Sequence, residues 1–490
     1  MNLINKFNIL DSYTKFSIMI IILFSIIVVS LTSIYHVSGD ACWHISTSRI
    51  IAEERIIPLN EGIGRQEPFW APPLFHIVSA FIYSVSGNAA DTAVKFISPT
   101  FAILTLILTF LIVKQIFNSK IGLYTLVFLA FIPLFMDYAI FSYVESMLTF
   151  FVVLSIYFAI KNRIILASIA TGLGILTKYN ALFIIPLLIY IIYKNNKGLT
   201  KNILTVILLP LIIASPWLIR NWILFGNPIW PFLNFIFNGV QGASYSGFHL
   251  SRLVDINLIT HTYLGLFGVP NGNPENLFFF DIPFLTLMII IWLLGTFIFI
   301  LPLIYIFFIK KIKNTTLLSV WIVLYTVLFL LYIPNVGFGV SRIIIPAIPA
   351  LAIIWAHGFN KILNSKNKKV ISIIFILIIS GFVVAEFTKL SLSAKEWNFY
   401  DEDFKWIQSN TNKNDIFMAS GQCIPYNINR QTIYSKANNL EKSDYIFVNQ
   451  NFKLDRKTII DNNLLSEIKG KSQIIYKNDK TKTEIYKIKQ

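Results

Sequence analysis

The sequence predicts a polytopic, all-α membrane protein of about eleven transmembrane helices with interfacial helices in its first outer loop, followed by a small C-terminal α/β domain that lies outside the cytoplasm. Of its 490 residues, 55% are hydrophobic and only 13% are charged, whereas a soluble domain carries about 25% charged residues. The charges are also unevenly placed, because residues 389–490 hold 29 of them and residues 1–388 hold the other 37. We therefore predict a transmembrane domain over residues 1–388 and a water-soluble domain over residues 389–490.

Eleven segments are apolar enough to be spans, since a span needs about 20 apolar residues or fewer where other helices shelter it. The first is expected to be a retained span and not a signal peptide, because no small-residue cleavage site follows it. The block 164–193 is too long for one span and is expected to turn at Thr177-Lys178-Tyr179-Asn180. The predicted spans are residues 16–36, 93–113, 121–140, 146–160, 164–177, 181–193, 202–217, 282–309, 316–334, 343–357 and 370–387.

The distribution of Lys and Arg predicts the orientation of these spans. With the N-terminus in the cytoplasm, the inner segments contain 16 basic residues and one acid, Asp11, whereas the outer segments of residues 1–388 contain 8 basic and 12 acidic residues. This is the positive-inside pattern, and it places the C-terminal domain outside the cytoplasm. The net charge of +16 is therefore an orientation signal. No nucleic-acid partner is expected, since the cations do not gather on one stripe.

Two outer segments are long, at about residues 37–92 and 218–281. Within the first, Ala41–Arg55 and Pro72–Ser86 mix apolar and polar residues and are predicted to be helices in the membrane interface. The second is rich in Gly, Asn, Pro and aromatic residues. A loop of that length is usually functional or covers a binding site.

The C-terminal domain alternates strand-like runs with polar turns, and residues Asp403–Asn410 are predicted to be helical. Cys42 and Cys423 fall on the same predicted side, so that a bridge is possible, but two free thiols are the favoured interpretation of so low a cysteine count. The predicted strands are Asp415–Ser420, Thr432–Ser435, Tyr445–Asn449, Gln473–Tyr476 and Glu484–Ile488.

Ionisable residues at the outer surface of so apolar a chain are candidates for function. Asp40 follows the first span, and it can be read as the N-cap of the next helix or as a general base at the membrane boundary, which are compatible roles. Glu145 lies by parity on the same side, with Asp137 close by. Two acids from separate loops make an acid/base or metal pair conceivable, but no cluster has the spacing of metal ligands.

Three cations lie on the outer side against the positive-inside bias: Lys178, Arg220 and Arg342. Cations at the ends of spans often have no binding role and only extend their side chains to the membrane–water interface. Three of them beside an acid fit an anion site, and the most natural anion at that depth is the phosphate of a membrane lipid. The outer tryptophans are typical of an interface belt, although some could stack on sugar rings: Trp43, Trp70, Trp217, Trp222 and Trp230.

These motifs, in this order, resemble the GT-C class of integral membrane glycosyltransferases. The relatives in question are the dolichyl-phosphate-mannose–protein mannosyltransferases and the lipid A aminoarabinose transferases, and the resemblance covers about residues 36–360. The motifs that carry it are Asp40 followed by Trp43-His44, Trp70-Ala71-Pro72-Pro73-Leu74-Phe75-His76, Glu145 opening a span, Gly172-Leu173-Gly174-Ile175-Leu176-Thr177-Lys178-Tyr179, Pro216-Trp217-Leu218-Ile219-Arg220-Asn221 with Gly226-Asn227-Pro228, and Ser341-Arg342-Ile343-Ile344-Ile345-Pro346-Ala347-Ile348-Pro349.

The resemblance implies transfer of a sugar from a polyprenyl-phosphate donor, with inversion, on the outer side of the membrane. It implies that Asp40 is the catalytic aspartate, that Glu145 is the second catalytic acid and that Lys178 lies near the lipid phosphate. Arg220 and Arg342 are assigned to the same phosphate by side and motif. His44, Trp70, His76 and Asp137 are expected to line the substrate pocket. Metal dependence cannot be read from the sequence, and the acceptor could be a protein, a lipid or a glycan.

Two other functions are compatible with a chain of this composition. A transporter or flippase for a lipid-linked sugar would show inverted repeats and polar groups at mid-membrane depth. Here the notable ionisable residues gather at the outer surface, which favours the transferase. A receptor or scaffold role for the C-terminal domain would leave the spans as an anchor, and eleven are excessive for that purpose.

Overall fold

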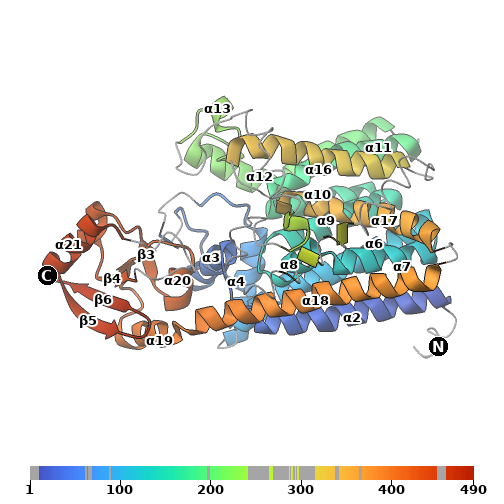
Figure 1. Ribbon diagram of the computed structural model, residues 1–490. Helices are drawn as coiled ribbons and strands as arrows, with labels where there is room; N and C mark the ends of the chain where they lie inside the picture. The colour runs from blue at the N-terminus through green and yellow to red at the C-terminus, as the bar shows by residue number, and fades with distance from the viewer. Residues whose placement is uncertain are drawn as a thin grey trace. The chain divides into compact units, whose positions relative to one another are not determined.

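The computed structural model (Figure 1) describes most of the chain. The chain divides into two compact units. The first unit comprises residues 1–32, 98–140 and 144–388, and the second comprises residues 33–97, 141–143 and 389–490. Thus the first outer segment belongs to the same unit as the C-terminal segment. The described residues are 10–60, 63–64, 69–87, 90–195, 199–240, 264–268, 315–336, 341–363, 367–449 and 460–489, with a few positions between 286 and 296.

Long apolar helices dominate the first unit, and the chain is an integral membrane protein. Among the described residues, five helical segments are long and apolar enough to cross a bilayer. A sixth arises if α7 (Ser119–Phe131) and α8 (Pro133–Ile140), which bend by 64°, form one span. The count of eleven stays a prediction, and the predicted span 282–309 lies largely outside the described residues. The five segments are Ser12–Ile34 (α2), Asp91–Ile116 (mostly α6, Ile97–Ile116), Leu199–Phe225 (α12), Ser341–Ile362 (ending in α17, Ile348–Ile362) and Lys368–Asn398 (α18).

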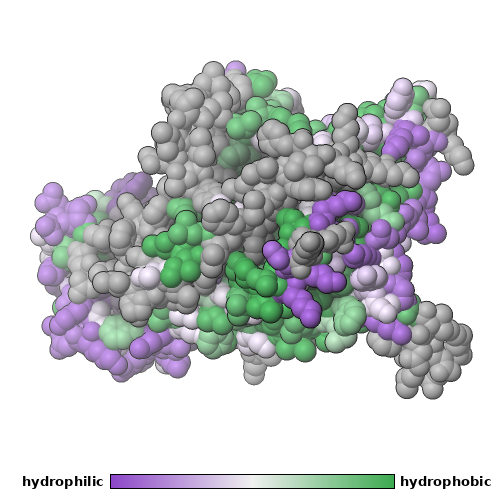
Figure 2. All heavy atoms as spheres, turned by 45° about the vertical axis from the view of Figure 1, so that its right-hand side comes forward, coloured by the Kyte–Doolittle hydropathy of each residue, from purple (hydrophilic) through white to green (hydrophobic). Residues whose placement is uncertain are grey.

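These helices expose apolar side chains that a lipid environment would cover. On α18, Ile373, Ile376 and Leu377 are each more than half exposed, which would be costly in water. Figure 2 shows patches of hydrophobic residues (green) and separate groups of hydrophilic residues (purple) on the described surface. The exposed apolar flanks of the helices fit a lipid environment.

Small residues bring the helices around the candidate site close together. Helix α10 (Ile164–Thr177) packs against α9 (Glu145–Ile160) and α12. A Cβ placed on Gly172 would lie 2.8 Å from Ile213 of α12, and one on Gly174 would lie 2.9 Å from Ala181. Close helix packing in membranes relies on such small residues. The helix ends at Thr177, where the turn was predicted, and η2 (Tyr179–Ile184) and α11 (Ile185–Asn195) follow.

The remaining described elements of the first unit are α13 (Asn234–Phe237), α16 (Thr315–Val336) and η6 (Ser341–Ala347). Helix α16 contacts both η6 and η2. The indole nitrogen of Trp321 on α16 donates to the carbonyl oxygen of Pro346 at 2.9 Å. This hydrogen bond joins η6 to α16.

In the second unit, the two helices predicted for the first outer segment are present as α3 (Asp40–Glu54) and α4 (Leu74–Ser86), which pack on each other. A short helix, α5 (Ala90–Lys95), follows α4. That α3 and α4 are helical is confirmed, whereas their location in a membrane interface stays a prediction.

The C-terminal segment forms a mixed sheet with flanking helices, as the sequence predicted. The sheet order is β1-β3-β2-β4-β6-β5, in which the first four strands run parallel and β4, β6 and β5 are antiparallel neighbours. Its elements are α19 (Asp401–Asn410), β2 (Ile416–Met418), α20 (Cys423–Ile428), β3 (Gln431–Ile433), η7 (Ala437–Lys442), β4 (Tyr445–Val448), α21 (Asn462–Lys471), β5 (Ser472–Asn478) and β6 (Thr483–Ile488).

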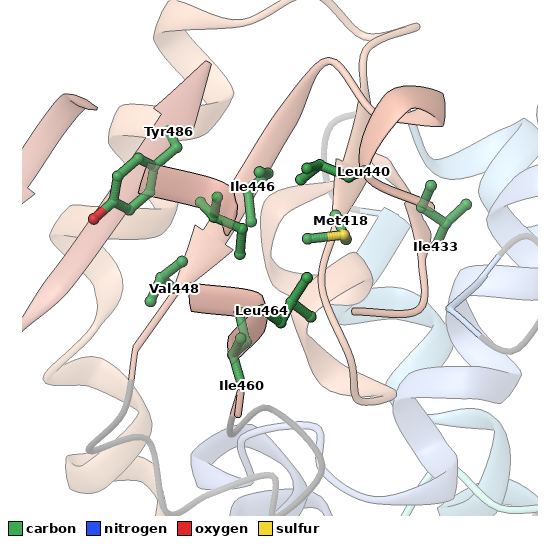
Figure 3. Close-up of a cluster of buried hydrophobic side chains, with 9 residues drawn as sticks. Met418, Ile433, Leu440, Ile446, Val448, Ile460, Leu464 and Tyr486 are labelled. Atoms are coloured by element: carbon green, nitrogen blue, oxygen red, sulfur yellow. The ribbon is translucent and has the colours of Figure 1, made fainter. Parts of the chain in front are cut away.

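Two features of this domain were not predicted. Strand β1 (Ile63–Gly64) comes from the first outer segment, and Ile63 pairs with Thr432 of β3. The interpretation of two free thiols is wrong, because Cys42 and Cys423 form a disulfide, and no described cysteine is free. Side chains from β2, β3, β4, β6 and α21 fill the core between the sheet and its helices, and Figure 3 shows Met418, Ile446, Val448, Leu464 and Tyr486 among them.

Candidate active site

A buried acid and two cations form the centre of the candidate site in the first unit. The Nζ of Lys178 donates to Oε1 of Glu145 at 2.7 Å. The Nε of Arg342 lies 3.7 Å from the same oxygen. The Glu145 side chain is 1% exposed, whereas those of Lys178 and Arg342 are each 20% exposed. The structure thus brings together three of the predicted site residues from distant parts of the sequence.

Each of the three residues lies at the end or in the first turn of a helix. Glu145 is the first residue of α9, where the helix dipole favours a negative charge. Lys178 follows the last residue of α10, has an extended backbone and donates its N–H to Gly174 at 2.8 Å. Arg342 is the second residue of η6. Helix termini therefore hold these charges in place without a long flexible loop.

One oxygen of the buried carboxylate in this cluster has no partner. It is Oε2 of Glu145, which is buried and has no hydrogen-bond partner among the described residues. A buried acceptor without a donor costs about 1–3 kcal/mol, and such groups in a native structure call for an explanation. A bound molecule that offers a hydroxyl group beside this cluster would satisfy this oxygen.

Arg220 belongs to a neighbouring group of residues that surrounds Tyr179, the residue after Lys178. The Arg220 guanidinium stacks on Trp217 at 4.5 Å from its ring centre and donates to the side-chain oxygen of Asn221 at 2.9 Å. Both Trp217 and Asn221 donate to the Tyr179 hydroxyl at 2.9 Å. Arg220 is therefore tied through Tyr179 to the chain segment that carries Lys178, and its contact with a phosphate stays a prediction.

Sequence reasoning missed two buried polar groups on elements that adjoin this cluster. The Tyr325 hydroxyl on α16 is buried, and it has no partner among the described residues. The same holds for the amide nitrogen of Asn180, two residues after Lys178. Helix α16 contacts both η6 and η2, which carry Arg342 and Asn180. A tyrosine at mid-helix in a predicted span was a usable signal, since polar groups in spans usually have a function.

Asp40 is the first residue of α3 and lies in the second unit. The preceding residue, Gly39, has a φ of +59°, which most side chains cannot adopt without strain. The backbone N–H of Asp40 donates to the Tyr143 hydroxyl at 3.0 Å. A Cβ on Gly39 would lie 2.8 Å from that hydroxyl. Gly39 and Tyr143, neither of which sequence reasoning singled out, thus determine how Asp40 enters the helix.

His44 lies one helical turn beyond Asp40 on α3, and aromatic side chains surround its ring and that of His76 on α4. The Nδ1 of His44 lies 3.0 Å from the Nε2 of His76, and both rings are buried. The Trp43 ring contacts both histidine rings and Trp70. Burial, followed by the proximity of His44, lowers the pKa of His76 well below its usual value. Two of the three residues expected in the pocket, His44 and His76, are thus in direct contact, and the Trp43 ring joins them to the third, Trp70.

Asp137 and a second acid, Glu386, both lie close to Gly268. A Cβ on Gly268 would lie 3.7 Å from Oδ2 of Asp137 and 3.9 Å from Oε2 of Glu386. Both carboxylates are buried. Glu386 is the one acid within the predicted span 370–387, and that position in an apolar run was a signal for it.

No group of three or more His, Cys, Asp or Glu residues that could hold a metal ion is found in the described part of the chain. Lys178 and Arg342, the predicted phosphate-binding residues, meet Glu145 in the first unit, whereas Asp40 lies in the second unit, where His44 contacts His76. That the two groups share one pocket stays a prediction.

Comparison with known proteins supports the resemblance noted in the sequence. Residues 71–220 match the family of dolichyl-phosphate-mannose-protein mannosyltransferases. The whole fold is similar to ArnT from Cupriavidus metallidurans in its apo state, with a TM-score of 0.64, 12% identity, and coverage of 97% of this chain and 98% of that one. ArnT bound to undecaprenyl phosphate gives a TM-score of 0.63 at 11% identity, over 96% and 97% of the two chains.

A more distant similarity is to the archaeal oligosaccharyltransferase AglB from Archaeoglobus fulgidus, solved with an inhibitory peptide and a dolichol-phosphate. Its TM-score is 0.55 at 12% identity, over 98% of this chain and 75% of that one. No curated protein matches the sequence. The predicted resemblance to the mannosyltransferases and to ArnT is confirmed by the family match over residues 71–220 and by the shared fold. At 11–12% identity, the solved structures show the fold alone.

Proposed function

We propose that this chain is a glycosyltransferase that moves a sugar from a polyprenyl-phosphate donor to an acceptor hydroxyl at the outer face of the membrane. Its fold is that of ArnT, which has been solved with undecaprenyl phosphate, and of AglB, which has been solved with dolichol-phosphate. A donor of this chemical class has a lipid tail for the bilayer and a phosphate for the membrane boundary.

The contact of Lys178 and Arg342 with Glu145 is the observation that carries the proposal. When the sugar leaves the donor, negative charge grows on the phosphate oxygen to which it was bonded. Fixed cations in a poorly hydrated site stabilise that charge far more than they would in water. Glu145 holds Lys178 in position, and its second oxygen is placed to accept a hydroxyl of the bound substrate.

Asp40 is the proposed general base. It takes the proton of the acceptor hydroxyl while the acceptor oxygen attacks the anomeric carbon from the face opposite the phosphate. The new glycosidic bond forms as the bond from carbon to phosphate oxygen breaks, so that the configuration inverts and lipid phosphate is released. No acid is required on the leaving side, because the cations stabilise the departing phosphate.

The acceptor is a hydroxyl group on a protein, a lipid or a surface glycan. The charge distribution supports a cytoplasmic N-terminus and a C-terminal domain outside the cytoplasm, on the side where Asp40, Glu145 and Lys178 are predicted to work. A transporter or flippase for a lipid-linked sugar is the alternative function, and no described feature favours it over the transferase.

The proposal is tested by incubating purified protein with a panel of polyprenyl-phosphate sugars and with acceptors of the three kinds, and scoring release of the free lipid phosphate. Turnover of at least one donor, with the sugar attached to the acceptor in inverted configuration, is the expected result. A flippase would move the labelled donor across a vesicle membrane and leave it intact. That outcome would overturn the assignment of a transferase.

A further inference from the structure

Helix α3, which begins at Asp40, is covalently tied to the C-terminal segment within the second unit. The Cys42–Cys423 disulfide joins its third residue to the first residue of α20, across 381 positions of the sequence. Both sulfur atoms pack against the short loop that precedes Asp40. The Cys42 sulfur lies 3.4 Å from the carbonyl oxygen of Val37, and the Cys423 sulfur lies 3.8 Å from that of Gly39.

A second attachment holds the same helix about two turns further along, at Arg49. Its guanidinium donates to the carbonyl oxygen of Tyr426 at 3.1 Å and to the side-chain oxygen of Asn429 at 2.8 Å. Its other terminal nitrogen lies 2.9 Å from both oxygens of Asp91 in α5. The Tyr426 ring lies 5.2 Å from the guanidinium carbon. Since the Arg49 side chain is only 12% exposed, these contacts replace its hydration.

The remaining contacts of α3 with the C-terminal segment are weaker. Lys413 pairs with Glu53 at 2.8 Å, but both side chains are largely exposed, and such pairs contribute little. Strand β1 adds only two residues to the sheet. Among the described residues, the disulfide and Arg49 are therefore the strongest covalent and polar attachments of α3 to the C-terminal segment, one near its start and one two turns further along.

We propose that Cys42, Cys423 and Arg49 are positioning residues for the base, and that the C-terminal domain serves to hold α3 so that Asp40 meets the acceptor hydroxyl. The inference rests on the proposed function. Displacing a reacting group by about 1 Å can lower the rate by about 100-fold. The phosphate-binding cations, Lys178 and Arg342, belong to the other unit and do not depend on these attachments. Loss of the attachments is therefore expected to lower kcat and to leave the KM for the donor unchanged.

The experiment compares four full-length proteins in the transfer assay: wild type, the double variant Cys42→Ser/Cys423→Ser, Arg49→Gln, and Lys413→Ala as the matched control. The double cysteine variant and Arg49→Gln are each expected to lose at least about 10-fold in kcat with an unchanged donor KM. Lys413→Ala is expected to behave as wild type. Reduction of wild type with a phosphine and reoxidation on the same sample gives a second route that needs no substitution. It is expected to lower kcat and then restore it.

Wild-type kcat in the reduced protein and in both variants would overturn the positioning role. A fall in kcat accompanied by an equal rise in donor KM would also overturn it, because general loss of structure would then explain the result. Wild type that turns over no donor in the same assay would instead contradict the proposed function itself, so that the two failures are distinguishable.

Discussion

Lys178 and Glu145, 33 residues apart, form an ion pair of 2.7 Å whose carboxylate is almost completely buried. Arg342 approaches the same carboxylate oxygen. Breaking a buried pair by removing one partner is destabilising, by about 3–5 kcal/mol, whereas replacing both partners can be neutral. The cluster can therefore be tested for stability and for function separately.

We expect Glu145→Gln and Lys178→Met each to lower the melting temperature of the detergent-solubilised protein, and the double variant to recover much of the loss. Turnover should stay low in the double variant, because a phosphate-binding cation is still missing. Thermal unfolding and lipid-phosphate release, measured on the same preparations, check this. A double variant that regains both stability and turnover would show that the pair is only structural. Lys201→Ala, near the N-terminal end of α12, is the control.

Removal of the Tyr325 hydroxyl is expected to have opposite effects on the stability of the protein and on its activity. Because it is buried without a partner among the described residues, Tyr325→Phe should leave the melting temperature unchanged or raise it. If the hydroxyl donates to the bound donor, the same change should raise the donor KM, by about 10-fold for a bond of about 1.4 kcal/mol. Tyr179→Phe is a contrast, since the Tyr179 hydroxyl accepts two hydrogen bonds and its loss should destabilise the protein. An unchanged donor KM in Tyr325→Phe would remove this residue from the site.

Gly39→Ala should impair catalysis through two effects at one position. The backbone has a φ of +59° there, and the new Cβ would lie 2.8 Å from the Tyr143 hydroxyl that accepts the Asp40 N–H. We expect kcat to fall while the donor KM is unchanged, as measured by steady-state transfer. Tyr143→Phe removes the hydrogen bond without the strain, and it should give a smaller effect in the same direction. A Gly39→Ala protein with wild-type kcat would show that the entry of the chain into α3 does not position the base.

The hydrogen bonds of Asp11, just before α2, predict that the stability of the folded protein depends on pH. Its carboxylate accepts the Thr14 hydroxyl at 2.6 Å and the Thr14 N–H at 3.0 Å, and these bonds lower its pKa from 3.8 to about 2. A carboxylate whose pKa is lowered by folding stabilises the folded state above its unfolded pKa, and the stabilisation is lost as the pH falls through the folded value. The melting temperature of wild type should exceed that of Asp11→Asn at pH 5, and the difference should shrink at pH 3. A difference that is constant with pH would contradict this account.

Sequence reasoning identified what the local pattern determines. The helices α3 and α4, the end of α10 at Thr177 and the strands of the C-terminal sheet follow from hydrophobic pattern and turn residues. It also selected Glu145, Lys178 and Arg342 as charges on the outer side. It could not find partners that only the tertiary fold supplies. The pairing of Ile63 with Thr432 joins segments that are hundreds of residues apart, and so does the disulfide.

The same limit explains the residues that were missed around the candidate site. Tyr143 and Asn180 are ordinary residues in their local sequence. They become informative only when their burial and their hydrogen bonds are known. Polar groups that are buried without a partner are a property of the packed structure, and no periodicity in the sequence reports them.

The central claim is that a carboxylate at Asp40 activates the acceptor while Lys178 and Arg342 hold the donor phosphate. The most direct measurement is the rate of inverting sugar transfer by Asp40→Asn beside wild type, with a donor that wild type uses. The account predicts that Asp40→Asn binds the donor with unchanged affinity, keeps the wild-type melting temperature and transfers no sugar. Transfer by Asp40→Asn at a rate close to that of wild type would contradict it.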